Sequence, residues 1–109
     1  FELVRALDEQ RAALAELGRR AEAPIVTDGV ARLAEHARTL GGAHFGPSGA
    51  GGGDVALWVG ASVPSRDFVA LAEREGYTEL ALDVGAAGAE LLPSPSARLA
   101  ADAPEESRA

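Results

Sequence analysis

Four glycines fall within five positions in the stretch Pro47-Ser48-Gly49-Ala50-Gly51-Gly52-Gly53-Asp54. Glycine costs about 0.5–1 kcal/mol relative to alanine in regular structure, so such a cluster indicates backbone that turns tightly or approaches another group closely. A short apolar segment, residues 43–46, precedes the cluster, and the run Val55-Ala56-Leu57-Trp58-Val59 follows it. The glycine-rich stretch is therefore predicted to be a loop between two strands.

The strand after this loop has side chains that alternate between two faces. Val55, Leu57 and Val59 share one face, and Ala56 and Trp58 share the other. Because both sets are apolar, we expect both faces to be covered. Trp58 is expected to be a packing residue, with contact to a second domain or a subunit partner as the alternative.

Two amphipathic helices are predicted before the loop. In the first, residues 1–20, leucines recur at helical spacing, and Arg11, Arg19 and Arg20 are expected on its solvated face; a ligand contact by one of these arginines is the alternative. Thr27 is a predicted N-cap for the second helix, residues 28–40, which Gly41-Gly42 ends.

After the loop, Pro64 and Ser65 open a third predicted helix, which Gly76 closes near Glu75. Residues 79–84 alternate between apolar and polar, which predicts a half-buried antiparallel strand, and residues 89–92 are a candidate edge strand. Residues 93–109 are predicted to be a disordered tail. The expected class is α+β: an antiparallel sheet backed by helices, in one domain over residues 1–92.

The composition narrows the classes of function. Ten arginines and no lysine stand against 17 acidic residues, and the net charge of −7 argues against an extended contact with nucleic acid or an anionic membrane. The chain has no cysteine and only two histidines, His36 and His44, so no metal site is expected in it. No apolar run is long enough to cross a bilayer, and a cytoplasmic location is expected. Because the chain begins at Phe1, we expect it to be part of a longer protein.

The glycine loop offers a way for an acidic protein to bind an anion locally. Successive backbone N–H groups in a tight turn can point into one concavity and hold a phosphate. Ser48 adds a hydroxyl donor, while Asp54 can accept a hydrogen bond, position a cation or cap the loop's own amides. The alternative is a flexible hairpin connection without a ligand. A Walker-type loop is excluded, since no Gly-Lys-Ser/Thr follows.

Residues 41–54, Gly41-Gly42-Ala43-His44-Phe45-Gly46 and then the loop, resemble the third conserved motif of the GHMP small-molecule kinases, and most closely its phosphomevalonate kinase form. Flanking segments 24–27 and 76–82 resemble the order of that family's C-terminal domain, so the resemblance spans roughly residues 1–92. The resemblance implies a ferredoxin-like domain packed against a larger N-terminal kinase domain. That missing domain would supply most of the site for ATP and its Mg²⁺.

The resemblance also implies which residues contact the phosphorylated small-molecule substrate. They are Ser48, Gly49, Ala50, Gly51, Gly52, Gly53 and Asp54, and no catalytic residue is implied in this chain. Two positions depart from the motif: Gly46 stands where the family has lysine, and Val55-Ala56 where it has Cys-Gly. His44 or an arginine from elsewhere could replace the lysine, although His44 is expected to be an ordinary strand residue. The expected function is phosphorylation of phosphomevalonate to diphosphomevalonate, and the alternative is a degenerate domain that binds or interacts without kinase activity.

Overall fold

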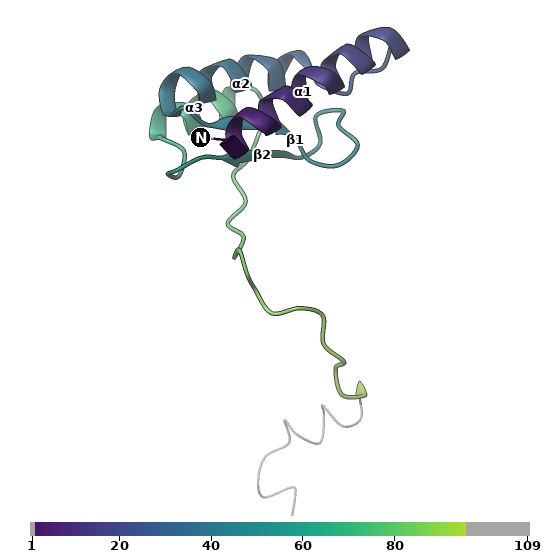
Figure 1. Cartoon of the computed structure of the whole chain (residues 1–109). Coiled ribbons are helices and arrows are strands. Elements are labelled where there is room, and N and C mark those ends of the chain that lie inside the picture. Colours follow the sequence, from purple (N-terminus) through teal and green to yellow (C-terminus); the bar gives the residue numbers. More distant parts are fainter. Residues whose placement is uncertain (1, 96–109) are drawn as a thin grey trace, which may run out of the picture.

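The structure, a computed structural model, describes residues 2–95. In chain order these residues form α1 (Glu2–Ala21), α2 (Asp28–Gly41), β1 (His44–Pro47), β2 (Ala56–Val59) and α3 (Arg66–Arg74) (Figure 1). The two strands pair antiparallel, with Phe45 opposite Trp58. The predicted α+β class is confirmed, and the three predicted helices and the two strands beside the glycine loop are present.

Helix α2 begins and ends at the residues that its sequence predicts. The Thr27 hydroxyl accepts a hydrogen bond from the backbone N–H of Val30 at 3.3 Å, which satisfies one of the free donors at the helix start. At the other end Gly42 has a left-handed conformation, with φ of 56°, and its N–H donates to carbonyls of the last turn. The helix buries one face, formed by Val30, Leu33, Ala34 and Ala37.

The core lies between α2, α3 and one face of the sheet. Phe45 of β1 packs edge-on against Phe68 of α3 at 5.3 Å between ring centroids, and against Tyr77 at 6.0 Å. Trp58 of β2 lies 4.6 Å from Phe68, while its indole N–H donates to the Ser62 carbonyl. Trp58 is therefore a packing residue, as predicted. Aromatic contacts thus join both strands to α3.

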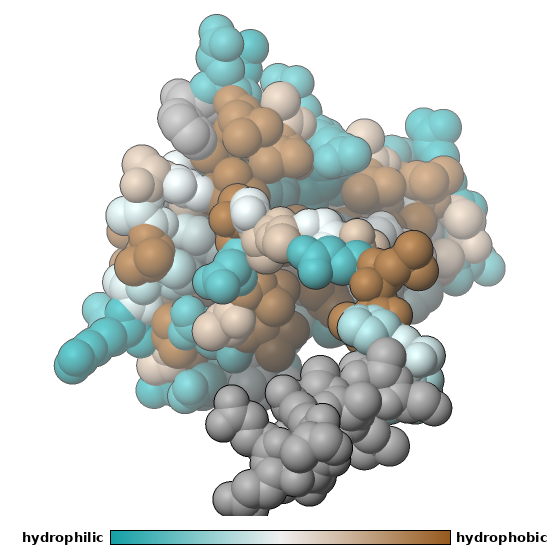
Figure 2. Space-filling view, turned by 90° about the horizontal axis from the view of Figure 1, so that it is seen from below, coloured by the Kyte–Doolittle hydropathy of each residue, from teal (hydrophilic) through white to brown (hydrophobic). Residues whose placement is uncertain are grey.

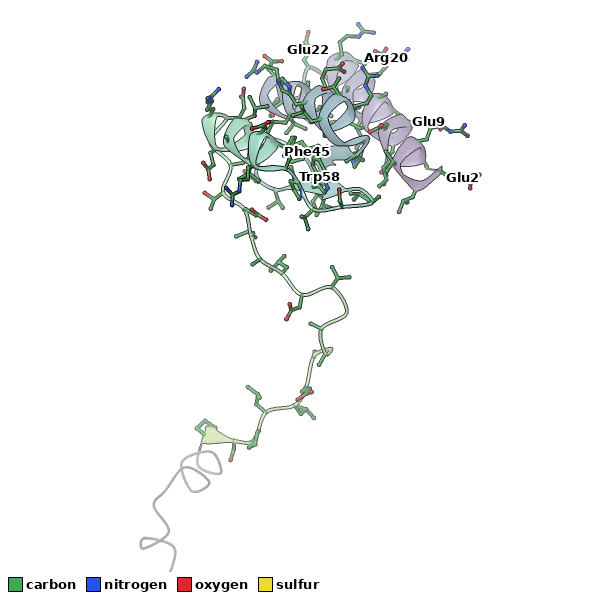
Figure 3. The ribbon with its side chains drawn as sticks, turned by 90° about the vertical axis from the view of Figure 1, so that its left-hand side faces the viewer. Glu2, Glu9, Arg20, Glu22, Phe45 and Trp58 are labelled. Atoms are coloured by element: carbon green, nitrogen blue, oxygen red, sulfur yellow. The ribbon has the colours of Figure 1, made fainter. Side chains whose placement is uncertain are left out.

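Helix α1 is less buried than its leucine pattern predicts. Val4 and Gly18 are its buried residues, whereas Leu3 and Leu17 are more than half exposed. Figure 3 shows Glu2, Glu9 and Arg20 of α1 projecting away from the body that holds Phe45 and Trp58. The helix ends before Glu22, which has a φ of 54°.

One ion pair joins α2 to the end of α3. Arg32 donates two hydrogen bonds of 2.8 Å to the carboxylate of Glu75, the residue that caps α3. The hydrogen bonds from Arg32 lower the pKa of Glu75, and the same contact raises the pKa of Arg32. This contact spans 43 positions of sequence and fixes the two helices relative to each other.

Two expectations for the sheet are wrong. Residues 78–94 form no strand, so residues 79–84 and 89–92 are not the strands predicted; Leu80, Leu82 and Val84 are exposed. Within residues 2–95 the sheet has only β1 and β2, which leaves no third strand for an alternating segment to pair with. Most of the predicted tail, residues 96–109, lies outside the described residues.

The sheet is also not covered on both faces. Leu57 of β2 is 50% exposed and Val55, just before the strand, is 49% exposed. On this side helix α1 packs against β1. Apolar groups consequently reach the surface on the face of the molecule seen in Figure 2.

Candidate functional site

The glycine loop joins β1 to β2 in a conformation that requires its glycines. The φ angles of Gly49, Gly51, Gly52 and Gly53 are 74°, 81°, 88° and 90°, values that residues with a Cβ atom adopt only with strain. A hydrogen bond of 3.0 Å from the Ser48 N–H to the Val55 carbonyl closes the base of the loop. The loop is therefore the predicted tight turn between two strands.

The loop is fastened to the segment that leads into α2. The Gly52 N–H donates to the Ile25 carbonyl at 3.0 Å. A Cβ atom on Gly51 would collide with that same carbonyl oxygen, and one on Gly53 would lie 3.2 Å from the Thr27 side chain. A shallow hollow of about 180 Å³ lies between residues 23–25 and 50–52. The hydrogen bond and these close approaches hold the loop in place, which a flexible connection would not show.

Most of the loop's backbone donors remain free. In the part of the chain that the structure describes, no acceptor is present for the N–H groups of Gly49, Ala50, Gly51, Gly53 and Asp54. The Ser48 hydroxyl and the Asp54 carboxylate also have no protein partner there, and both residues are exposed. The Asp54 side chain therefore does not cap the loop's amides. All seven predicted site residues lie together in this loop, with donors available to an anion.

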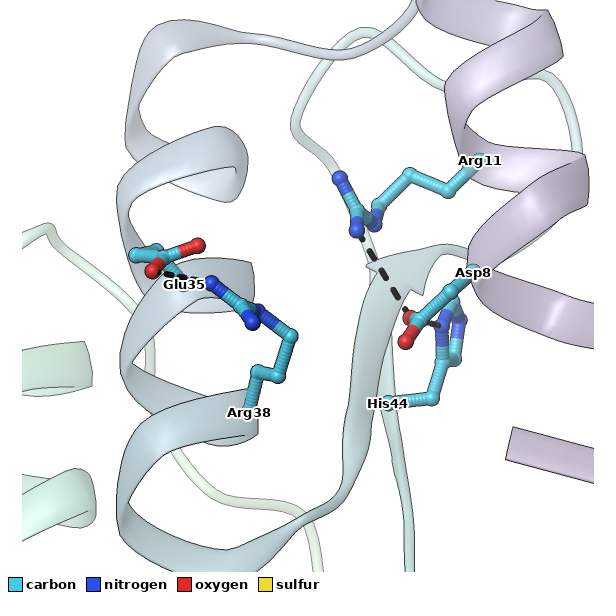
Figure 4. A network of polar contacts seen from close by, with 5 residues as sticks. All are labelled: Asp8, Arg11, Glu35, Arg38 and His44. Atoms are coloured by element: carbon cyan, nitrogen blue, oxygen red, sulfur yellow. Dashed lines mark hydrogen bonds and ion pairs between the residues drawn. The ribbon is translucent and has the colours of Figure 1, made fainter. Parts of the chain in front are cut away.

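A polar cluster that the sequence did not predict lies beside the loop, between α1 and β1 (Figure 4). The Nδ1 atom of His44, in β1, lies 2.7 Å from Oδ1 of Asp8, in α1, and the His44 side chain is only 7% exposed. His44 is thus a buried strand histidine. Arg11, one turn after Asp8, approaches the same carboxylate with Nη2 at 3.6 Å.

Gly46 is crowded by this cluster. A Cβ atom on Gly46 would lie 2.7 Å from His44 Nε2 and 3.4 Å from Cδ of Arg11. A lysine at this position would need both side chains to move. The Arg11 side chain occupies the space beside Gly46, so a cation is present next to the position where the GHMP motif has lysine, although it comes from a different element.

The prediction that Arg11 lies on the solvated face of the first helix is wrong. Its side chain is 22% exposed, whereas those of Arg19 and Arg20 are 70% and 74% exposed and pair with Glu16 as a solvated face should. The helical pattern could not show this, because the partner surface is β1, which lies more than 30 residues further along the chain.

Within residues 2–95, no group of three or more histidine or acidic side chains is arranged to hold a metal ion. None of the helices there combines the length and the apolar character that crossing a membrane requires. A second hollow, of about 390 Å³, lies between the end of α1 and the start of α2, and residues 23 and 24 line both hollows.

Comparisons of the chain with protein-family models, with curated proteins and with solved structures found no match. The geometry of the glycine loop and the resemblance of its motif are therefore the grounds for proposing a function.

Proposed function

We propose that this chain is the C-terminal domain of an ATP-dependent small-molecule kinase of the GHMP type, acting on phosphomevalonate in the cytoplasm. The observation that carries the proposal is the glycine loop. Four left-handed glycines hold it in a fixed turn, and five of its backbone N–H groups have no acceptor within residues 2–95. A phosphate, with several acceptor oxygens and negative charge, is the ligand that such an arrangement suits.

In this proposal the loop holds the phosphate of the substrate. The γ-phosphoryl group of ATP is transferred to an oxygen of that phosphate, the bond to the β-phosphate breaks, and diphosphomevalonate and ADP result. Phosphoryl transfer depends mainly on positioning and on stabilising charge, and fixed amide donors contribute to both. Ser48 adds a hydroxyl donor, and Asp54 borders the substrate. The N-terminal domain would supply most of the ATP site and the Mg²⁺ that accompanies ATP.

The order of elements supports a ferredoxin-like fold for the complete domain. That fold has the order β-α-β-β-α-β, and α2, β1, β2 and α3 correspond to its four middle elements. The two outer strands of that fold are absent from residues 2–95, and in our proposal other parts of the full-length protein supply them.

The test uses the full-length protein with ATP and phosphomevalonate, and measures both ADP and diphosphomevalonate. We expect turnover, and we expect the Gly51→Ala variant to reduce it, while Gly88→Ala, outside the loop, leaves it unchanged. A protein that phosphorylates neither phosphomevalonate nor any other phosphorylated or hydroxyl metabolite would refute the proposal.

The absence of lysine at position 46 favours one alternative function, a domain that binds a phosphorylated ligand or a partner without catalysis. The coding sequence upstream of Phe1 distinguishes the two. A Gly-Leu-Gly-Ser-Ser type of ATP loop there supports the kinase, and a preceding domain without one supports the binding module.

A further inference from the structure

The Arg11 side chain is 22% exposed, and within residues 2–95 it is paired only with the carboxylate of Asp8. None of its N–H groups makes a hydrogen bond within residues 2–95, and Nε is fully covered. Its closest carboxylate oxygen, Asp8 Oδ1, is 3.6 Å away, too far for a hydrogen bond, and already contacts His44 at 2.7 Å. Burial of a charged donor without an acceptor is unfavourable, so packing alone does not explain why Arg11 Nε is buried here.

Other arginines of the described chain show the contrast. Arg19 and Arg20 on α1 both donate to Glu16, and Arg32 makes two hydrogen bonds to Glu75. Those side chains are more than half exposed, where partners matter least. Arg11 is more buried than any of them and has no such bond.

Arg11 is placed next to the start of the glycine loop. Its Cδ lies 3.4 Å from where a side chain of Gly46 would begin, and Gly46 is two residues before Ser48. Figure 4 shows the guanidinium beside the chain as it leaves the end of β1. A cation whose guanidinium makes no hydrogen bond within residues 2–95 therefore lies beside the residue that leads into a loop with free N–H donors.

We propose that Arg11 is a phosphate-binding residue, whose guanidinium contacts the same phosphate group that the amides of the glycine loop hold. The inference rests on the proposed function, since it takes the loop to be a phosphate site. The planar guanidinium can donate two parallel hydrogen bonds to phosphate oxygens, and it carries a positive charge. The neutral amides of the loop cannot supply that charge. The Asp8 carboxylate, engaged with His44, keeps Arg11 close to β1 without satisfying its donors.

This assignment also accounts for Gly46. A lysine there would reach the phosphate from the strand, whereas Arg11 reaches it from the helix that covers the strand. Only a residue without a side chain leaves room for Arg11 and His44 at this place. In this proposal Arg11 of α1 supplies the positive charge that a lysine at position 46 supplies in the motif.

The experiment titrates the 109-residue chain with inorganic phosphate and with pyrophosphate, at constant ionic strength, and follows the backbone amide signals of residues 48–54 by NMR. We compare Arg11→Gln with Arg19→Gln, a control that removes the same charge from the exposed face of α1. Charge-assisted hydrogen bonds of this kind lead us to expect affinity about 10- to 100-fold weaker for Arg11→Gln. Arg19→Gln should bind like the wild type. Arg11→Lys, which keeps the charge but not the planar fork, should be intermediate.

The outcomes separate the two proposals. If the wild type shows loop shifts and Arg11→Gln binds phosphate equally well, the inference about Arg11 is wrong and the loop remains a phosphate site. If the wild-type loop shows no shifts with phosphate or pyrophosphate, the loop is not a phosphate site and both fail. Urea unfolding of each variant checks that it is folded. If Arg11→Gln is not folded, the phosphate affinity of Arg11→Lys tests the inference instead. An affinity equal to that of the wild type would overturn the planar contact.

Discussion

Replacing Gly51 and Gly52 separately by alanine separates the two reasons why the loop needs glycine. Both residues have similar left-handed φ angles, 81° and 88°. A Cβ atom on Gly52 would meet no atom within 4 Å, whereas one on Gly51 would collide with the Ile25 carbonyl oxygen. The backbone strain is thus nearly the same in the two variants, and only Gly51→Ala adds a steric conflict.

The magnitudes follow from these two terms. A left-handed alanine costs about 1–2 kcal/mol, and the lower entropy of the unfolded alanine chain offsets about 0.4–1 kcal/mol of this, so Gly52→Ala should lose about 0.5–1.5 kcal/mol. In Gly51→Ala the loop must also move away from Ile25, which breaks the hydrogen bond between Gly52 N–H and the Ile25 carbonyl. That loss adds about 0.5–1.5 kcal/mol, for a total of about 1–3 kcal/mol.

Urea unfolding followed by the fluorescence of Trp58, the single tryptophan, measures both free energies. The slope of the free energy against urea should stay constant, which shows that the denatured state is unchanged. Gly88→Ala is the matched control, because a Cβ atom on Gly88 would have no neighbour within 4 Å and Gly88 has no left-handed φ. The free energy of unfolding of this variant should equal that of the wild type. Equal losses for Gly51→Ala and Gly52→Ala would refute the contact between the loop and Ile25.

Three further predictions concern the body of the domain, and each uses the same unfolding assay. Leu33→Ala removes a fully buried side chain and should cost about 2–5 kcal/mol; a loss below about 1 kcal/mol would show that Leu33 is not in the core. Asp8→Ala leaves the buried Nδ1 of His44 without its partner and should cost about 1–3 kcal/mol, whereas an unchanged midpoint would mean that α1 does not dock on β1 through this pair. Because Arg32 lowers the pKa of Glu75, the pair stabilises the folded state above the ordinary pKa of a glutamate, and this contribution is lost as the pH falls through the lowered value. The difference in urea midpoint between the wild type and Glu75→Gln should therefore shrink on acidification, and a difference that is independent of pH would contradict the pairing.

The helices and the loop could be predicted from the sequence because their signals are local. Thr27 caps α2 and Gly42 ends it, as the positions of an N-cap residue and a left-handed glycine indicate. The clustering of glycines likewise predicted a tight turn, and all four glycines adopt positive φ angles in it. Each of these features depends on residues within a few positions of one another.

The features that could not be predicted depend on distant parts of the chain. The alternation in residues 79–84 is typical of a strand, but a strand forms only where another strand offers its edge, and none is offered to it within residues 2–95. The environment of Arg11 depends on β1, so the helical period alone assigned it to the wrong face. The local sequence around Gly46 likewise could not show the arginine that lies beside it.

Within residues 2–95 β2 pairs only with β1, and its other edge, which has no strand partner there, affects how the chain behaves at high concentration. Natural sheets often protect such edges with lysine, a bulge or proline, but β2 reads Ala-Leu-Trp-Val and carries no charge. Leu57 is half exposed on the strand, and Leu80, Leu82 and Val84 are exposed as well. Light scattering that rises with concentration is the expected behaviour of this chain in storage. Leu57→Lys should reduce the scattering, because a charge on the strand disfavours association between molecules. It should leave the aromatic core on the opposite face intact.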